Sequence, residues 1–505
     1  MSITKAGSRP KSFRSEVKKP VEKAKAQQPR AGTPAKADSL QKNDAAQRVR
    51  AQQHRDSFEP AAPSRRSATQ QPRMAEIGSH THGAGGTHDH GSEGIRGSIG
   101  STLGRGSAPT VSTEASGRTV VELGSGNDNA TLSQTADGGL EVRSNGHTVT
   151  LTAEQARNAV IRGGDGHDTI TADASVTQGV RIEGGAGDDR LEGGAGDDRL
   201  SGGEGSDVIL GKGGDNSLRG EAGDDYLEGG AGNDRVYGGD GRDVMYGLDG
   251  KDRMYGGNDR DYIDGGRGDD VAAGGDGDDQ VIGGRGDDIL LGGRGNDAVA
   301  GGQGNDTLRG GTGSDKLYTE AGDTVRDLSS SDTQQTVDMT DADSIGSSVS
   351  VTGSDEFRAR VESDLDALRS LPVGQELLSE LDASGRSTTI QETSSGNSAG
   401  GTNFRDGFMS VDGTPGKGTD AQVNYNTSRI SLGSEEWMTR PPVVGLEHEL
   451  VHALDLVNGK LAPGETNGTR NLENAAVGLP YDHDGDPSTP AHTPDRPTEN
   501  QLRDE

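Results

Sequence analysis

The chain has 505 residues but no cysteine, and only 28% of its residues are hydrophobic and 3% aromatic. The absence of cysteine excludes disulfide scaffolds and thiolate zinc sites. The shortage of apolar residues, set against 83 glycines, is unlike the composition of a protein with one continuous core. An ordinary globular core therefore cannot extend over the whole chain.

The sequence also lacks membrane and Sec export signals. No apolar run approaches the ~18 residues of a membrane span, and the first 20 residues lack the apolar centre of a Sec signal peptide. We therefore predict a soluble protein which, if secreted, leaves by a type III or type I route. The net charge is −31, although residues 1–75 carry 17 Lys/Arg against 6 Asp/Glu. The acidic remainder disfavours nucleic acid and anionic membranes as partners and favours cations.

Residues 1–115 are predicted to form a disordered, basic N-terminal region. They are rich in Ser, Gln, Ala, Pro, Arg and Lys and poor in the apolar residues that a core requires. His80, His82, His88 and His90 lie here, and they either bind a transition metal weakly or belong to a solvated flexible tract. The basic charge fits an export or targeting tail, or a solubilising linker.

A strict nine-residue repeat begins at Gly184 and continues for fifteen units. Its sixth position is Asp in fourteen units and Asn216 in the remaining one, and its eighth position is apolar throughout. The preceding residues, 116–183, contain short β-type runs and isolated versions of the same motif. We predict that residues 116–183 form a β-rich cap and that residues 184–327 form the repeat domain.

The nonapeptide GGxGxDxUx, where U is apolar, resembles the RTX calcium-binding repeats. The resemblance implies a parallel β-roll with two nonapeptides per coil, U residues inside, and Ca²⁺ bound by Gly carbonyls and Asp carboxylates of adjacent turns. Glycines permit left-handed turns, alternate strand residues face inward, and hard oxygen ligands suit Ca²⁺. Fifteen units would give about seven coils, or roughly 34 Å at the ~4.8 Å strand spacing. The predicted calcium ligands are Asp189, Asp198, Asp207, Asp225, Asp234, Asp243, Asp252, Asp270, Asp279, Asp288, Asp297, Asp306 and Asp315.

Charge in the repeat predicts that folding depends on calcium. Residues 184–317 carry 30 Asp/Glu and 14 Lys/Arg, a net charge of −16, and the roll would stack these carboxylates coil upon coil. Ions bound only by the folded state shift the folding equilibrium towards it. We expect a largely disordered array at low calcium and a folded one at millimolar calcium, with weak or empty sites near Asn216 and Asp261, whose units depart from the pattern.

Residues 328–350 are predicted to be a polar linker, and residues 351–505 a separate α+β domain of about 150 residues. An amphipathic helix is expected to end before Pro372, and a second helix to follow it. The apolar residues that define these two helices are Phe357, Val361, Leu365, Leu368 and Leu371, then Leu377, Leu378 and Leu381.

One stretch, Pro441 to Gly459, carries reactive chemistry at defined spacing. It contains the HExxH motif His448-Glu449-Leu450-Val451-His452 within an apolar segment that has prolines at its start and glycine at its end. On a helix, histidines four residues apart share one face and can bind one Zn²⁺, with Glu449 beside them. The positions that a metzincin fills with Gly and His are Asp455 and Asn458, which excludes that class.

The third zinc ligand is less determined by the sequence. Glu473 follows His452 by 21 residues, a distance that allows a second, antiparallel helix to return it to the metal. Glu465, Asp482, His483 and Asp484 remain alternatives for this ligand. Tyr481 either stabilises an oxyanion or is a buried structural tyrosine. Asp455 either supports a histidine ligand or faces solvent.

Three motifs in order, RPPVVGLEHELVHALDLVNG, NLENAAVGLPYD and TPDRPTENQLRDE, resemble the NleD-type effector zinc metallopeptidases that bacteria inject into host cells. The resemblance covers residues 351–505 and implies that His448 and His452 bind zinc and that Glu449 is catalytic. By analogy with relatives, it also implies a protein substrate of a host cell.

The sequence therefore predicts a multidomain protein with a disordered N-terminus, a parallel β-roll and a C-terminal α+β zincin-like metallopeptidase domain. One catalytic Zn²⁺ and several structural Ca²⁺ ions are the expected cofactors. The expected function is that of a secreted bacterial endopeptidase that acts outside the bacterium or after delivery into a host cell. The alternative is a calcium-binding surface or adhesion protein in which the HExxH helix has only a structural role.

Overall fold

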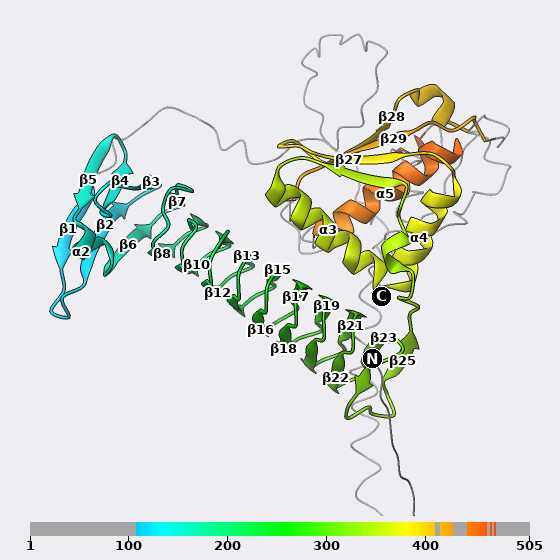
Figure 1. Ribbon diagram of the computed structural model, residues 1–505, viewed down its shortest axis with the longest axis horizontal. Helices are drawn as coiled ribbons and strands as arrows, with labels where there is room; N and C mark the ends of the chain where they lie inside the picture. The colour runs from blue at the N-terminus through cyan, green and yellow to red at the C-terminus, as the bar shows by residue number, and fades with distance from the viewer. Residues whose placement is uncertain (1–107, 410–414, 428–441, 462–464, 467–468, 471–505) are drawn as a thin grey trace, which may run out of the picture. The chain divides into compact units, whose positions relative to one another are not determined.

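The computed structural model describes residues 108–409, 415–427, 442–461, 465–466 and 469–470 (Figure 1). The predictions for residues 1–107, including the tract from His80 to His90, lie outside these ranges. So do those for Glu473, Tyr481, Asp482, His483 and Asp484.

Two sheets wind along the repeat region, and their strands alternate in sequence. Sheet A has the order β1 (Thr110–Thr113), β2 (Thr119–Ser125), β6 (Ala159–Asp165), β8 (Arg181–Ala186), β10 (Arg199–Glu204), β12 (Ser217–Ala222), β14 (Arg235–Asp240), β16 (Arg253–Asn258), β18 (Val271–Asp276), β20 (Ile289–Arg294), β22 (Thr307–Thr312) and β24 (Thr324–Val325). Sheet B has the order β25 (Thr333–Thr336), β23 (Lys316–Thr319), β21 (Ala298–Gln303), β19 (Gln280–Arg285), β17 (Tyr262–Arg267), β15 (Val244–Asp249), β13 (Tyr226–Ala231), β11 (Val208–Leu210), β9 (Arg190–Glu192), β7 (Thr169–Ala172), β3 (Asn129–Gln134), β4 (Leu140–Ser144) and β5 (His147–Leu151).

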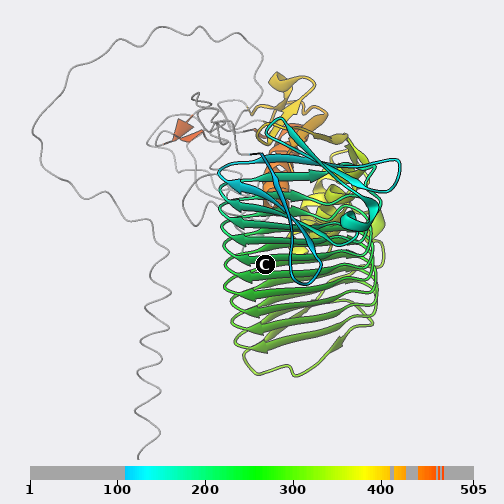
Figure 2. The same ribbon diagram turned by 90° about the vertical axis from the view of Figure 1, so that its left-hand side faces the viewer.

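Neighbouring repeat strands of one sheet are parallel and lie eighteen residues apart. Leu200 of β10 pairs with Leu218 of β12, and Leu218 pairs in turn with Val236 of β14. Each coil therefore contains two nonapeptides, and the coils stack in register (Figure 2). The apolar residue at position eight is buried in all fifteen units, from Leu191 to Leu317, and these side chains form the interior of the roll.

The coils begin before the strict repeat. Within residues 116–183, β2 pairs in parallel with β6 and β3 with β7, while β4 and β5 add antiparallel strands and α2 (Ala153–Ala156) follows. Within residues 328–350, β25 pairs with β23 and η1 (Ala342–Ser344) follows it. Turn glycines allow this stacking: Gly185 has φ +128°, and a Cβ there would collide with the carbonyl oxygen of Gly164 one coil away.

The described residues of the C-terminal domain form a four-stranded sheet and three α-helices. Its sheet has the order β26 (Val349–Thr352), β27 (Thr388–Glu392), β29 (Ala421–Tyr425) and β28 (Ser398–Gly401), and η2 (Phe404–Gly407) follows β28. The helices are α3 (Asp355–Arg369), α4 (Pro372–Ala383) and α5 (Pro442–Asn458), and the hairpin of β30 (Glu465–Thr466) and β31 (Thr469–Arg470) follows them. As the spacing predicted, α3 ends before Pro372, and its apolar positions Phe357, Val361, Leu365 and Leu368 are buried.

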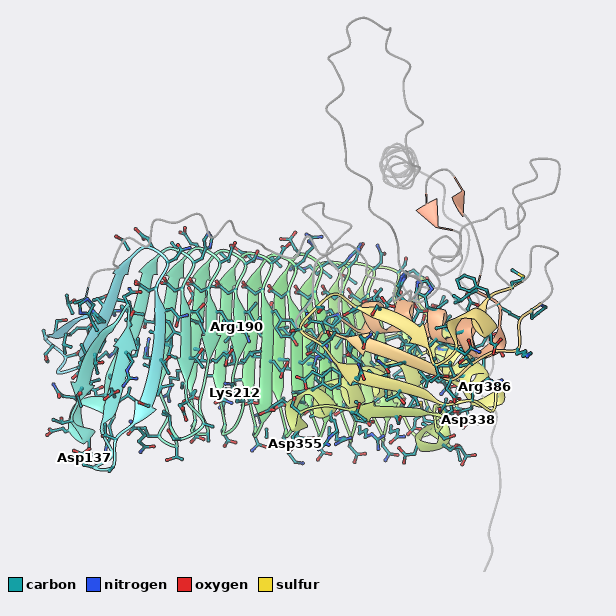
Figure 3. All side chains as sticks on the ribbon, turned by 90° about the horizontal axis from the view of Figure 1, so that it is seen from above. Asp137, Arg190, Lys212, Asp338, Asp355 and Arg386 are labelled. Carbon is teal, nitrogen blue, oxygen red and sulfur yellow. The ribbon has the colours of Figure 1, made fainter. Side chains whose placement is uncertain are left out.

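Sheet B of the roll packs against α3, and one hydrophobic cluster joins the two regions. Tyr226, Tyr246 and Ile282 of the roll belong to this cluster together with residues of α3 and α5. Nearer the cap, sheet B instead carries charged outward side chains: Arg190 and Lys212 each pair with Glu192 at 2.7 Å (Figure 3). Within the described ranges, no helix is long and apolar enough to cross a membrane.

Candidate metal centres

The HExxH motif lies on α5. Pro442 occupies the first turn, where its missing N–H does not interrupt the helix. Gly459 ends the helix with φ +66°, and the N–H of Lys460 donates to the carbonyl oxygen of Asp455 at 2.7 Å. The helix packs against β28 and β29 on the sheet and against α3 and α4. Its apolar residues account for this burial, so the motif is held by a rigid, well-packed element.

His448 and His452 face one another across one turn of α5. Their Nε2 atoms lie 3.2 Å apart, their ring centroids lie 4.7 Å apart, and the ring planes are nearly perpendicular at 88°. Two Zn–N bonds of about 2.0–2.1 Å that meet at a tetrahedral angle place their nitrogens about 3.3–3.4 Å apart. The separation of the two Nε2 atoms is therefore close to the separation that a shared zinc ion requires.

Three carboxylates, those of Glu447, Glu449 and Asp455, are buried on α5 together with the histidines. Glu449 follows His448 directly and is only 2% exposed. Asp455, for which the sequence left open a solvent-facing role, is also buried. A buried carboxylate interacts strongly with neighbouring charges because little water screens it. The helix thus keeps Glu449 in a protected position next to the histidine pair.

The remaining predicted zinc-site residues are not placed. Glu473, Tyr481, Asp482, His483 and Asp484 lie outside the described ranges, and Glu465 lies in β30 without a described side chain. Among the residues that the structure describes, no three His, Cys, Asp or Glu side chains are grouped to hold a metal. The third zinc ligand therefore stays a prediction, with Glu473 as the leading candidate.

The repeat aspartates form two ladders along the roll. In each ladder, Oδ1 of one side chain accepts a hydrogen bond from the backbone N–H of the corresponding residue one coil earlier, as from Asp189 to Asp207 at 2.8 Å. One ladder contains Asp168, Asp189, Asp207, Asp225, Asp243, Asp261, Asp279, Asp297 and Asp315; the other contains Asp198, Asn216, Asp234, Asp252, Asp270, Asp288 and Asp306.

At most ladder positions the second carboxylate oxygen lies close to a backbone carbonyl oxygen. Oδ2 of Asp189 lies near Gly184, where the carbonyl oxygen of Gly202 from the next coil also approaches. This Oδ2 atom is buried without a hydrogen-bond partner, and so are its counterparts at every ladder aspartate except Asp198, whose Oδ2 accepts the N–H of Gly194 at 2.8 Å. A carboxylate oxygen and a carbonyl oxygen repel one another, and both are ligands that Ca²⁺ prefers. The two ladders therefore fit calcium.

Burial changes the acidity of the ladder carboxylates. It raises the pKa of Asp225 to about 8 and that of Asp270 to about 9, and the charges of ladder neighbours add to the effect. Desolvation penalises the charged form, and like charges nearby do the same. In the absence of a cation, burial in the folded roll therefore favours the protonated form of these two aspartates, whereas bound calcium would favour their ionised form.

The structure also assigns two ladder positions that the predicted calcium set omits. Asp168 precedes the strict repeat, and Asp261 belongs to the irregular unit GGNDRDYID, yet each has the same Oδ1 contact and the same buried Oδ2 atom as the others. The signal for Asp168 was present in the sequence, because Gly163 and Gly164 stand at the repeat spacing before it. For Asp261, the sequence showed the regular sixth position, but the irregular residues around it led to the prediction of a weak or empty site.

Family models match both the C-terminal domain and the repeat region. Residues 345–505 match the Peptidase M91 family model, which is described as an effector protein. The model of the RTX calcium-binding nonapeptide repeat matches eight stretches between residues 156 and 323, and those from residue 181 onwards overlap. No curated protein matches the chain. The two resemblances inferred from the sequence, to RTX repeats and to an effector peptidase, are thereby confirmed.

Proposed function

We propose, on the premise that this chain joins a Peptidase M91 effector domain to RTX calcium-binding repeats, that it is a zinc-dependent endopeptidase. The observation that carries the proposal is the 3.2 Å separation of the Nε2 atoms of His448 and His452 on the buried helix α5. That separation suits two bonds to one tetrahedral zinc ion. A purely structural helix has no requirement for two histidines and a glutamate in one buried sector.

In the proposed mechanism, His448 and His452 would bind Zn²⁺, and a third protein ligand, with Glu473 as the leading candidate, would complete the set of protein ligands. When bound, Zn²⁺ polarises the scissile carbonyl and lowers the pKa of a water molecule. Glu449 accepts the proton of the attacking water and delivers it to the departing amine. The burial of Glu449 supports this role, because a protected carboxylate keeps its proton away from bulk solvent.

The substrate and the site of action are proposed at a coarser level. The effector description of the matched family supports a secreted protein that acts on a protein substrate of a host cell. The RTX repeats support folding after export into a calcium-rich medium. Type III and type I secretion are both compatible with the sequence. A secretion assay that compares deletion of residues 1–80 with deletion of the last residues would separate the two routes.

The test of the peptidase proposal is the variant Glu449→Gln, which keeps the size of the side chain and removes the base. Peptide cleavage is expected to fall by about 10²–10⁴-fold while zinc content is unchanged. Glu376→Gln, at an exposed glutamate of α4, is the matched control and is expected to retain full activity. Equal residual activity in the wild type and Glu449→Gln would contradict the proposal and favour the calcium-binding surface protein instead.

A further inference from the structure

The two outer faces of the roll differ in what covers them. Positions seven and nine of each nonapeptide point outward on both sheets. On sheet A, apolar side chains at these positions remain exposed, as at Tyr237, Tyr255 and Ile289. On sheet B, side chains at equivalent positions, such as Tyr246 and Tyr262, are buried. They belong to the hydrophobic cluster shared with the C-terminal domain and not to the cluster inside the roll. The outer face of sheet B is therefore an interface.

The covering element is α3, and its contacts with the roll include a fully buried ion pair. Arg360 and Asp364 pair at 2.7 Å, with side chains 1% and 0% exposed. The guanidinium of Arg360 lies 3.2 Å from the ring centroid of Tyr246, and its Nε donates to the hydroxyl of Tyr226 at 3.3 Å. Arginine and aspartate are almost never buried completely unless they are paired with one another and contact other polar groups. Here Tyr226 and Tyr246 of the roll contact the guanidinium of Arg360.

Two further polar contacts fix the register of α3 on sheet B. Ser363 donates to Oδ2 of Asp264 at 2.9 Å, and Arg285 forms a two-point ion pair with Asp366 at 2.6 and 2.9 Å. Both lie on the face of α3 that meets the roll, and bidentate pairs of this kind impose orientation as well as proximity. The docking of α3 is therefore directional rather than a loose apolar contact.

The same surface reaches the zinc helix. On the opposite side of the ion pair, Tyr425 of β29 donates to Asp364 at 2.9 Å, and β29 packs on α5. A small apolar cavity of about 30 Å³ also joins the roll, α3 and the first turn of α5. Its lining includes Ile282, Ala300 and Tyr318 from the roll, Ala367 and Leu371 from the α3 region, and Val443 and Val444 from α5.

We propose that the calcium-folded roll completes the peptidase domain: the outer face of sheet B is the surface that holds α3 and the first turn of α5 in place. Presentation of His448 and His452 then depends on calcium bound to the coils between β13 and β23. This inference rests on the proposed function for its consequence, since the site that calcium assembles is the proposed zinc site. The roll thereby acts as an internal scaffold, and the enzyme stays incomplete where calcium is scarce.

The roll offers a matched pair of variants for the test. Tyr246 and Tyr255 occupy the same position in consecutive nonapeptides, but Tyr246 is buried under α3 on sheet B, whereas Tyr255 is 49% exposed on sheet A. Tyr246→Ala removes the aromatic ring that contacts Arg360 and leaves the side chains inside the roll unchanged. Tyr246→Phe keeps the ring, and Tyr255→Ala removes an equal volume from the uncovered face.

The experiment is hydrogen exchange of the full chain across a calcium titration, read separately for roll peptides and for α3 and α5. In the wild type, protection of α3 and α5 is expected to rise at the same calcium concentration as protection of the roll. In Tyr246→Ala, the roll still gains protection while exchange in α3 rises about tenfold or more, and cleavage activity falls in parallel. Tyr246→Phe and Tyr255→Ala should follow the wild type.

Two outcomes would overturn the inference: full protection of α3 and α5 in chelator, or identical behaviour of Tyr246→Ala and Tyr255→Ala. Failure of the proposed function looks different. A wild type that cleaves no peptide at any calcium or zinc concentration, while α3 and α5 still gain protection with the roll, would refute the peptidase assignment and support the scaffold role.

Discussion

Asn216 donates from Nδ2 to the carbonyl oxygen of Gly229 over 3.2 Å, at the ladder position where every other strict repeat has an aspartate. Its Oδ1 atom still accepts the N–H of Asp198 at 2.9 Å, as the aspartates do from their own neighbours. The amide Nδ2 of Asn216 thus donates a hydrogen bond to the glycine carbonyl oxygen that it faces. At an aspartate position, Oδ2 stands in place of Nδ2 and cannot donate. A cation bound between Oδ2 and the carbonyl oxygen would be attracted to both.

Exchange of the amide and the carboxylate should consequently change calcium stoichiometry. Asn216→Asp is expected to add calcium binding, because it places an unpartnered oxygen opposite Gly229. Asp252→Asn is expected to remove calcium binding while the roll still folds at saturating calcium, since the new amide can donate to the facing carbonyl. Calcium titration by calorimetry, with circular dichroism as the folding measurement, checks both variants.

Asp252→Ala is the control for that experiment. It removes the ligand without supplying a donor, which leaves a buried carbonyl unsatisfied at a cost of about 1–3 kcal/mol. Equal calcium stoichiometry in the wild type, Asn216→Asp and Asp252→Asn would show that the ladder oxygens are not calcium ligands.

The calcium-free roll should be more stable at lower pH. The folded-state pKa values of Asp225 and Asp270, about 8 and about 9, lie above their ordinary value of 3.8 because of burial. A group with a raised folded-state pKa contributes stability that is fully present below the unfolded pKa and is lost as pH rises through the folded one. In chelator, β-sheet content is therefore expected to be greater at about pH 6 than at about pH 9.

Calcium should reverse this dependence, because the metal binds the ionised carboxylates and protons compete with it. Urea unfolding at the two pH values, with chelator and with millimolar calcium, tests both signs. Greater stability of the chelated roll at the higher pH would contradict the burial of these carboxylates.

Local spacing made much of the fold predictable. The period of nine placed the inward residues from Leu191 to Leu317 and the ladder aspartates, because a strict repeat can satisfy its buried and turn positions in only one way. The HExxH spacing likewise predicted a helix that carries both histidines on one face, and α5 provides it. In each case the information lies within a few residues of the feature that it determines.

The docking of α3 on the roll was not predicted, because its partners are far apart in the chain. Tyr246 and Asp364 are 118 residues apart, and no local pattern couples them. Outward apolar residues did not supply the missing information. Tyr246 and Tyr262 occupy outward positions and are buried on sheet B, but Tyr237 and Tyr255 occupy outward positions and are exposed on sheet A. Apolar residues at outward positions therefore do not by themselves identify which face of the roll has a partner.

The identity of the third zinc ligand gives a further test. Glu473→Gln is expected to lower zinc affinity by about 100-fold or more, since the neutral amide is a poor zinc ligand and two histidines alone bind weakly. Asp482→Asn and Asp484→Asn serve as controls and should leave zinc content unchanged. Zinc titration against a chelating indicator measures all three variants. Retention of zinc by Glu473→Gln together with loss by one of the controls would move the ligand assignment to that residue.

The buried pair of Arg360 and Asp364 allows a double-mutant test of the interface energetics. Asp364→Leu alone leaves the guanidinium buried without its carboxylate and is expected to destabilise the C-terminal domain by about 3–5 kcal/mol. Arg360→Met alone should be destabilising for the same reason, because the carboxylate of Asp364 would remain buried without its positive partner. The hydroxyl of Tyr425, which donates to Asp364 at 2.9 Å, would still stabilise that charge directly.

The double variant Arg360→Met/Asp364→Leu removes both charges and fills their volume with apolar atoms, so it should recover most of the lost stability. Denaturant unfolding of the full chain in saturating calcium measures the cycle. Losses that add independently in the double variant would mean that the two side chains do not act as one buried unit. Recovery would show instead that the contact of α3 with Tyr246 depends on charge balance, and that an apolar helix surface can dock on the roll equally well.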